Sequence, residues 1–183
     1  SILGDKLQNF SEDMDIEVIN AGIPAIGSLN ESKLIKGKLV NYEPDMIIIY
    51  DGANDAACKL HEHITKNHEN TEEYIKQRCG VYSPNNYQKV YAERWSEVCE
   101  SGKKNGFKTV FIGQPIPHFD KILSDQEFEQ YFLRPEHTLY LDALESFAQE
   151  TKNIEHCTVT TNFKDIFDYY LEPLYIDYVH VNH

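Results

Sequence analysis

The chain has 183 residues, the size of one ordinary domain and too long for a peptide held together only by disulfides. Hydrophobic residues make up 41% and charged residues 26%, so the chain can bury a sizeable core and is not a disordered one. The formal net charge of −13, spread along the chain without a basic patch, argues against a nucleic-acid partner.

Strand and helix patterns alternate in the first part of the chain. An amphipathic stretch over 2–10 is followed by a short predicted strand at 16–20, and a helix is predicted over 34–40 after a possible cap at Asn30. The run 45–50 is unbroken and apolar, which is typical of a strand buried on both faces of a parallel sheet. It is far shorter than the roughly 20 residues that a membrane span requires, so no membrane span is expected.

The same alternation continues toward the carboxyl terminus. Apolar residues recur at helical spacing over 87–99 and stop before Gly102, a strand is predicted at 108–112, a helix over 141–148, and a weaker strand at 158–160. The order predicts an α/β fold, a three-layer α/β/α sandwich with a flavodoxin-like parallel sheet. No repeat or linker divides the chain, so residues 1–183 are expected to form a single domain.

One polar segment, 56–86, interrupts this rhythm just after the apolar strand. Ligands bind beyond the carboxyl ends of strands in open parallel sheets, so an insertion there is placed to act as a lid, although a surface excursion without a role fits equally well. It contains His61, His63 and His68. Residues two positions apart on a helix face different ways, and no cysteine or carboxylate pair completes a tetrahedral set of metal ligands. No metal site is expected here.

The four cysteines, Cys58, Cys79, Cys99 and Cys157, lie far apart and form no Cys-x-x-Cys pair. Their even number permits two disulfides, but a core of this size does not require them, so buried or incidental thiols are the favoured interpretation. Cys58 follows the apolar strand closely, yet no neighbouring base in the sequence would make it reactive.

Three stretches could carry chemistry, since each follows a strand or lies near the carboxyl terminus. They are Asn20-Ala21-Gly22-Ile23-Pro24-Ala25-Ile26-Gly27-Ser28, Asp51-Gly52-Ala53-Asn54-Asp55 and Asp177-Tyr178-Val179-His180. The first can direct backbone N–H groups into the crevice, and Asn54 in the second can present an amide donor above the sheet. In the third, an acid three residues before a histidine can reach back to the imidazole ring.

These groups suit acyl transfer. Attack on an ester carbonyl places negative charge on oxygen, which fixed donors stabilise, while a histidine takes the proton of the nucleophile and an acid orients that histidine. Asn54 would supply a donor, His180 the base and Asp177 the orienting acid. Ser28, read as an exposed serine beside a glycine, lacks the Gly-x-Ser-x-Gly context of a nucleophile.

The order of NAGIPAIGS, DGAND and DYVH resembles the SGNH, or GDSL-like, hydrolase family of esterases and lipases, over nearly the whole chain. The Gly-x-Asn-Asp stretch after a buried strand is the most specific part. The resemblance implies the fold above (the SGNH hydrolase fold) and a serine-dependent hydrolase that cleaves an ester through an acyl-enzyme without a cofactor. It assigns catalytic roles to His180, Asp177 and Asn54, and places Ala25 and Gly52 in the substrate-binding turns.

Two departures from the family are visible. Its second block usually ends in a glycine whose N–H completes the oxyanion hole, and that position falls on Ala25. Its first block, Gly-Asp-Ser with the nucleophile, is absent, because Lys6 stands where the serine would be in Leu3-Gly4-Asp5-Lys6. The chain is therefore expected to be a domain trimmed at both ends and inactive alone, with the first strand and its serine upstream of residue 1.

Other functions fit the same residues. An acyltransferase would use an alcohol in place of water, a non-catalytic ligand-binding module would use the crevice and the insertion, and a metal-dependent hydrolase would use the three clustered histidines. Asn54 itself has a competing interpretation as a cap of the following helix. The favoured partner is a small-molecule ester.

Overall fold

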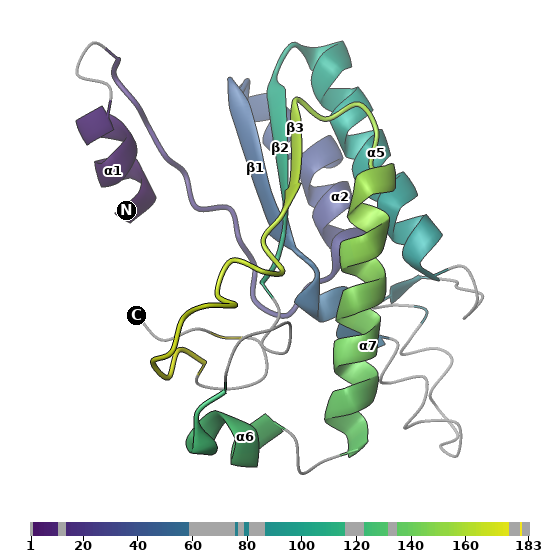
Figure 1. Cartoon of the computed structure of the whole chain (residues 1–183). Coiled ribbons are helices and arrows are strands. Elements are labelled where there is room, and N and C mark those ends of the chain that lie inside the picture. The colour runs from purple at the N-terminus through teal and green to yellow at the C-terminus, as the bar shows by residue number, and fades with distance from the viewer. Residues whose placement is uncertain are drawn as a thin grey trace.

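The computed structural model describes residues 2–10, 14–58, 76, 79–80, 87–115, 123–131, 135–175 and 180, and confirms an α/β fold with a parallel sheet (Figure 1). The helices are α1 (Ile2–Phe10), α2 (Ser28–Gly37), α5 (Tyr87–Asn105), α6 (Asp125–Tyr131) and α7 (Pro135–Glu150), with short 3-10 helices η1 (Leu39–Tyr42) and η3 (Thr151–Asn153). The strands are β1 (Met46–Asp51), β2 (Lys108–Gly113) and β3 (Val159–Asn162). No helix in these ranges is both long enough and apolar enough to cross a membrane.

The sheet has the order β1-β2-β3, and both pairings are parallel. The register pairs Met46 with Lys108 and Asp51 with Gly113, and Gly113 in turn with Asn162. All three carboxyl ends therefore meet at one edge of the sheet. These strands match the predicted ones at 45–50, 108–112 and 158–160, displaced by one or two residues.

The core lies between this sheet and the helices α2, α5 and α7, which lie together in Figure 1. Its centre is aromatic: the ring of Tyr91 lies 6.2 Å from those of Trp95 and Phe111 and 4.7 Å from that of Phe147. Trp95 and Phe111 are completely buried. Aromatic rings at such distances add to the stabilisation from burial, so this cluster holds α5 and α7 on the sheet.

Helix α5 continues past Gly102, where the sequence pattern predicted that it would stop. A Cβ at Gly102 would lie 2.9 Å from Cγ2 of Thr109 on β2, so the glycine lets the helix and the strand approach closely. Here the glycine serves packing and does not end the helix.

The predicted second helical layer is not seen on the opposite face of the sheet among the described residues. Exposure alternates along β1, where Met46, Ile48 and Tyr50 are 47%, 44% and 50% exposed while Ile49 is buried. The expectation that this strand is buried on both faces is therefore wrong for the described chain. An apolar run identifies a strand, but only the surrounding elements decide how many of its faces are covered.

The strand predicted at 16–20 is also wrong. This segment is irregular and forms no ladder with the described strands, and Ile19 is 67% exposed. Together with α1 it lies apart from the sheet in Figure 1, tied to α1 where the Gln8 side chain accepts the Ile16 N–H and donates to the Met14 carbonyl. A strand becomes part of a sheet only when a neighbouring strand pairs with its main-chain N–H and C=O groups, and no described strand pairs with this segment.

The cysteines form two disulfides, Cys58–Cys79 and Cys99–Cys157, which corrects the expectation of free thiols. Their sequence separations are 21 and 58 residues. The fold brings both pairs within bonding range: Cys58 and Cys79 flank most of the predicted insertion, and Cys99 on α5 meets the segment that precedes β3. Cys58 is consequently not available as a reactive thiol.

Candidate active site

The turn after β1 lies at the carboxyl edge of the sheet, where the sequence placed two of the candidate residues. Gly52 is buried and has φ +148°, a conformation that residues with a side chain rarely adopt, and residues 53–58 then form a helical turn. The Gly52 carbonyl accepts the Ala56 N–H at 3.1 Å, so the turn begins directly at the strand end. Asn54 is the second residue of this turn.

Side chains from three other elements hold the main chain on both sides of Asn54. The Ala53 N–H donates to Oε1 of Gln114 at 2.7 Å, and the Tyr140 hydroxyl donates to the Ala53 carbonyl at 2.9 Å. The Tyr87 hydroxyl donates to the Asp55 carbonyl at 2.7 Å. Because these contacts come from the end of β2, from α5 and from α7, the turn is fixed by the packed part of the fold.

The Asn54 carboxamide itself is half-buried and makes no hydrogen bond with any described residue. It does not cap the helical turn, so the competing interpretation of Asn54 is not supported by its contacts. An amide that no described residue engages can bind a ligand oxygen.

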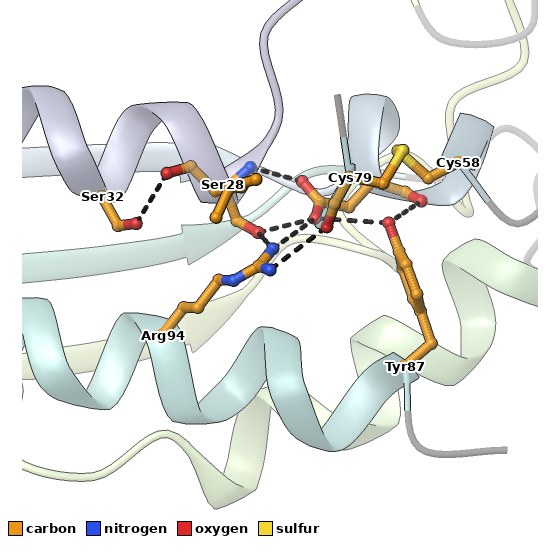
Figure 2. Close-up of polar contacts among 8 residues, drawn as sticks. Ser28, Ser32, Cys58, Cys79, Tyr87 and Arg94 are labelled. Atoms are coloured by element: carbon orange, nitrogen blue, oxygen red, sulfur yellow. Dashed lines mark hydrogen bonds and ion pairs between the residues drawn. A yellow bond between two sulfur atoms is a disulfide. The ribbon is translucent and has the colours of Figure 1, made fainter. Parts of the chain in front are cut away.

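Asp55 joins this turn to the amino terminus of α2. Its Oδ2 accepts the Ser28 N–H at 2.6 Å and its Oδ1 accepts the Ser28 hydroxyl at 2.6 Å (Figure 2). Gly27 is the N-cap of α2 and has no side chain with which to cap it, so Asp55 provides the cap from another part of the chain. Ser28 is completely buried, which corrects the expectation that it is exposed.

Arg94 on α5 completes this network. Its Nη1 donates to the Ser28 Oγ at 3.1 Å and lies 4.0 Å from Oδ1 of Asp55, while its Nη2 donates to the Cys79 carbonyl at 3.1 Å. Figure 2 shows Arg94 and Tyr87 pointing from α5 toward Ser28 and Cys79, with the Cys58–Cys79 disulfide beside this network. The base of the predicted insertion is thereby tied to the two site loops.

Ala25 lies in the other loop that Asp55 joins, three residues before Ser28. It has φ +61°, the left-handed conformation that costs a residue with a Cβ about 1–2 kcal/mol. Ala25 is exposed, and no described residue accepts a hydrogen bond from its N–H. Strained backbone of this kind is often found at functional sites.

Three carboxyl groups surround this junction. Burial raises the pKa of Glu31 on α2 to about 7, with a further contribution from Asp55. Burial also raises the pKa of Asp51 well above its ordinary range, reinforced by Asp55 and Glu31, and one oxygen of Asp51 has no described hydrogen-bond partner. Burial raises the pKa of Asp55 too, but the bonds from Ser28 and the Arg94 charge oppose that rise.

Of the predicted pair Asp177 and His180, the structure describes His180. His180 is exposed, and Asp177 lies outside the described residues, so the pairing of these two residues stays a prediction. His61, His63 and His68 also lie outside them. In the rest of the chain that the structure describes, no three histidine, cysteine or carboxylate side chains are arranged to hold a metal ion.

Sequence reasoning missed the residues that hold Asn54 in place. Gln114 lies two residues beyond the strand predicted at 108–112, so its position at a strand end could have marked it as a site residue. Tyr140 and Arg94 lie on helices, and nothing in their sequence neighbourhood distinguishes them from other core-facing residues. Their roles follow only from how the helices pack.

Comparison with solved structures gives one line of independent support for the fold. An acetyl xylan esterase has a similar structure, with a TM-score of 0.59 and 14% sequence identity over 99% of this chain and 81% of that chain. No protein-family model matches the sequence, and no curated protein matches it. At this identity the likeness concerns the fold alone.

Proposed function

We propose that this chain belongs to a serine-dependent ester hydrolase of SGNH type, in which Asn54 donates a hydrogen bond to the oxyanion. The observation that carries the proposal is the Asn54 carboxamide. It has no described partner, while side chains of the packed fold hold the Ala53 N–H, the Ala53 carbonyl and the Asp55 carbonyl on either side of it. The fold that this chain shares with an acetyl xylan esterase supports it.

The oxyanion site of the proposal has two donors from this chain. Asn54 supplies its amide N–H and Ala25 its main-chain N–H, and the Asp55–Ser28 bonds join the two loops that carry them. Donors fixed before the reaction begins need no reorganisation when charge develops, which is why such a site accelerates the reaction. The Gly52 conformation lets the chain turn tightly enough to place Asn54 at the strand end.

The remaining groups act on protons. The proposal takes the nucleophilic serine from sequence upstream of residue 1, and His180 removes its proton as the serine attacks the ester carbonyl. Asp177 orients the imidazole and stabilises its charged form. His180 then gives the proton to the leaving alcohol, and water attacks the acyl-enzyme, with His180 again as the base. No cofactor takes part in this scheme.

The first experiment compares two forms of the protein with a fluorophosphonate probe, which labels activated serines. The form that carries its natural sequence upstream of residue 1 is expected to be labelled, and residues 1–183 alone are not. Absence of labelling in the longer form, or labelling of 1–183 alone, would contradict the assignment of the serine.

The second experiment tests Asn54 in the longer form. Asn54→Ala is expected to lower kcat for hydrolysis of p-nitrophenyl acetate by roughly 10²–10³-fold, the usual effect of removing one oxyanion donor. Asn41→Ala is the matched control, because Asn41 is exposed and its amide only bonds the Gly37 carbonyl. An Asn54→Ala variant with unchanged kcat would exclude the proposed oxyanion role. Acetylated xylan is the next substrate to test, because the structural neighbour is an acetyl xylan esterase.

A further inference from the structure

Glu127 is a buried carboxylate that belongs to the first turn of α6, with its side chain 1% exposed. Its Oε2 accepts the Ser124 N–H at 2.9 Å and the Ser124 hydroxyl at 3.0 Å, and the Glu127 N–H donates to that hydroxyl oxygen at 3.2 Å. This reciprocal arrangement is a capping box, which fixes the start of the helix.

The second carboxylate oxygen of Glu127 serves a distant segment. Its Oε1 accepts the main-chain N–H of Leu174 at 3.0 Å and that of Tyr175 at 3.1 Å. A capping box does not need these bonds. The bond from Tyr175 is buried and the bond from Leu174 is part-buried. Hydrogen bonds to a carboxylate are charge-assisted and stronger than those between neutral groups.

Tyr175 is fixed from the other side as well. It is 5% exposed, and its ring meets that of Phe167 edge-on at 6.2 Å. The segment is thus anchored five residues before His180, so the Cα of His180 lies within about 18 Å of the anchor. Figure 1 shows α6 and the segment 163–175 beyond the carboxyl ends of the strands, the end of the sheet from which the Gly52 turn departs.

We propose that Glu127 is a positioning residue, whose bonds to Leu174 and Tyr175 set the place from which His180 reaches the reacting ester. The inference rests on the proposed function in taking His180 as the base. A general base acts only within about 2.6–3.2 Å of the proton that it removes, and a displacement of about 1 Å can cost about 100-fold in rate. A base joined to the packed fold by only a few residues depends on a fixed point close to it in the chain.

The first measurement is amide hydrogen exchange by NMR on residues 1–183. Glu127→Gln keeps the shape of the side chain but turns one acceptor into a donor that faces other donors. Protection of the Leu174 and Tyr175 amides is expected to fall by about tenfold or more, in line with the loss of a hydrogen bond to a charged group. Glu129→Gln, an exposed position on the same helix, is expected to leave it unchanged.

Ser124→Ala is the sharper control, because it removes the hydroxyl of the capping box and leaves both bonds to the 174–175 segment. If Glu127→Gln does not fold, Glu127→Asp keeps the charge but shortens the side chain by one methylene. It is then expected to show the same loss of protection. Unchanged protection in both Glu127 variants overturns the anchor.

The second measurement gives kcat and KM for p-nitrophenyl acetate in the form that carries the natural upstream sequence. Glu127→Gln is expected to lower kcat by about 10- to 100-fold and to leave KM within about twofold, while Ser124→Ala keeps kcat. An equal fall in kcat for Ser124→Ala would show a merely structural role and overturn the proposal. His180→Ala with wild-type kcat would overturn the proposed function itself, and the exchange result would still report on the anchor.

Discussion

Asp55 binds Ser28 through both of its carboxylate oxygens, each 2.6 Å from its donor, and this pair of hydrogen bonds joins the two loops that carry Ala25 and Asn54. The approach is possible only because residue 27 is glycine. A Cβ at Gly27 would lie 2.8 Å from Oδ2 of Asp55, closer than such atoms normally come.

Gly27→Ala is therefore expected to push Asp55 away from Ser28 and to lower the free energy of unfolding by about 1–3 kcal/mol, measured by urea denaturation. Gly37→Ala is the matched control, because Gly37 ends the same helix and a Cβ there would meet nothing within 4 Å. Equal stability of the two variants would mean that the Asp55–Ser28 contact can shift without cost.

Ala25→Gly tests the strained turn. Ala25 has φ +61°, where glycine avoids the steric cost of a Cβ but loses more backbone entropy on folding. The variant is expected to be more stable than the wild type by about 0.5–1 kcal/mol, and to keep its activity because the N–H is retained. Ala25→Val, which is β-branched, is expected to be less stable than wild type in the same urea titration. Loss of stability in Ala25→Gly would contradict a steric origin of the strain.

The sequence patterns located the three strands of the described sheet and the Gly52 turn because these depend on local residues, whereas the strand predicted at 16–20 did not form. An apolar run identifies a strand even where, as in β1, one face is exposed. The residues that follow parallel strands gather at one edge of the sheet whatever the details of packing. This reasoning is sufficient to place Asn54 at the carboxyl edge from the sequence alone.

The contacts that hold this turn could not be predicted in the same way. Arg94 meets Asp55 only because α5 packs beside α2, and no short-range pattern contains that distance. Four cysteines allow several pairings, and proximity in the fold decides among them. The bonds from Glu127 to Leu174 and Tyr175 span 47 and 48 residues of sequence, so no local pattern contains them either.

Glu31 makes stability depend on pH. Its pKa rises from 4.5 to about 7 in the folded protein, first through burial and then through the charge of Asp55. The folded state therefore binds more protons than the unfolded state between about pH 4.5 and pH 7, so this group lowers stability as the pH rises through that window. Its contribution is neutral below the window and unfavourable above it.

Glu31→Gln removes this titration. The variant is expected to match the wild type at pH 4 and to be more stable than it at pH 8 by about 1–2 kcal/mol, a value reduced for the partial exposure of the group. Urea denaturation at several pH values gives the comparison. Glu43→Gln is the control for the loss of a glutamate carboxyl at an exposed position. A Glu31→Gln difference that does not grow with pH would contradict the shifted pKa.

The two disulfides are expected to stabilise the fold to different degrees, because they close loops of different length, with sequence separations of 21 and 58 residues. The chain-entropy model gives about 3 kcal/mol for the shorter loop and about 4 kcal/mol for the longer one. If entropy alone acts, the double variant Cys99→Ser/Cys157→Ser should thus lose slightly more free energy of unfolding in urea denaturation than Cys58→Ser/Cys79→Ser.

The shorter bridge, however, also holds the Cys79 carbonyl against Arg94, whose other nitrogen binds Ser28. Its removal should reduce the protection of the Ser28 amide in hydrogen exchange, while the other double variant leaves that amide unchanged. Thiol titration of the denatured, unreduced wild type should find no free thiol, and a positive titration would refute the pairing on which both expectations depend.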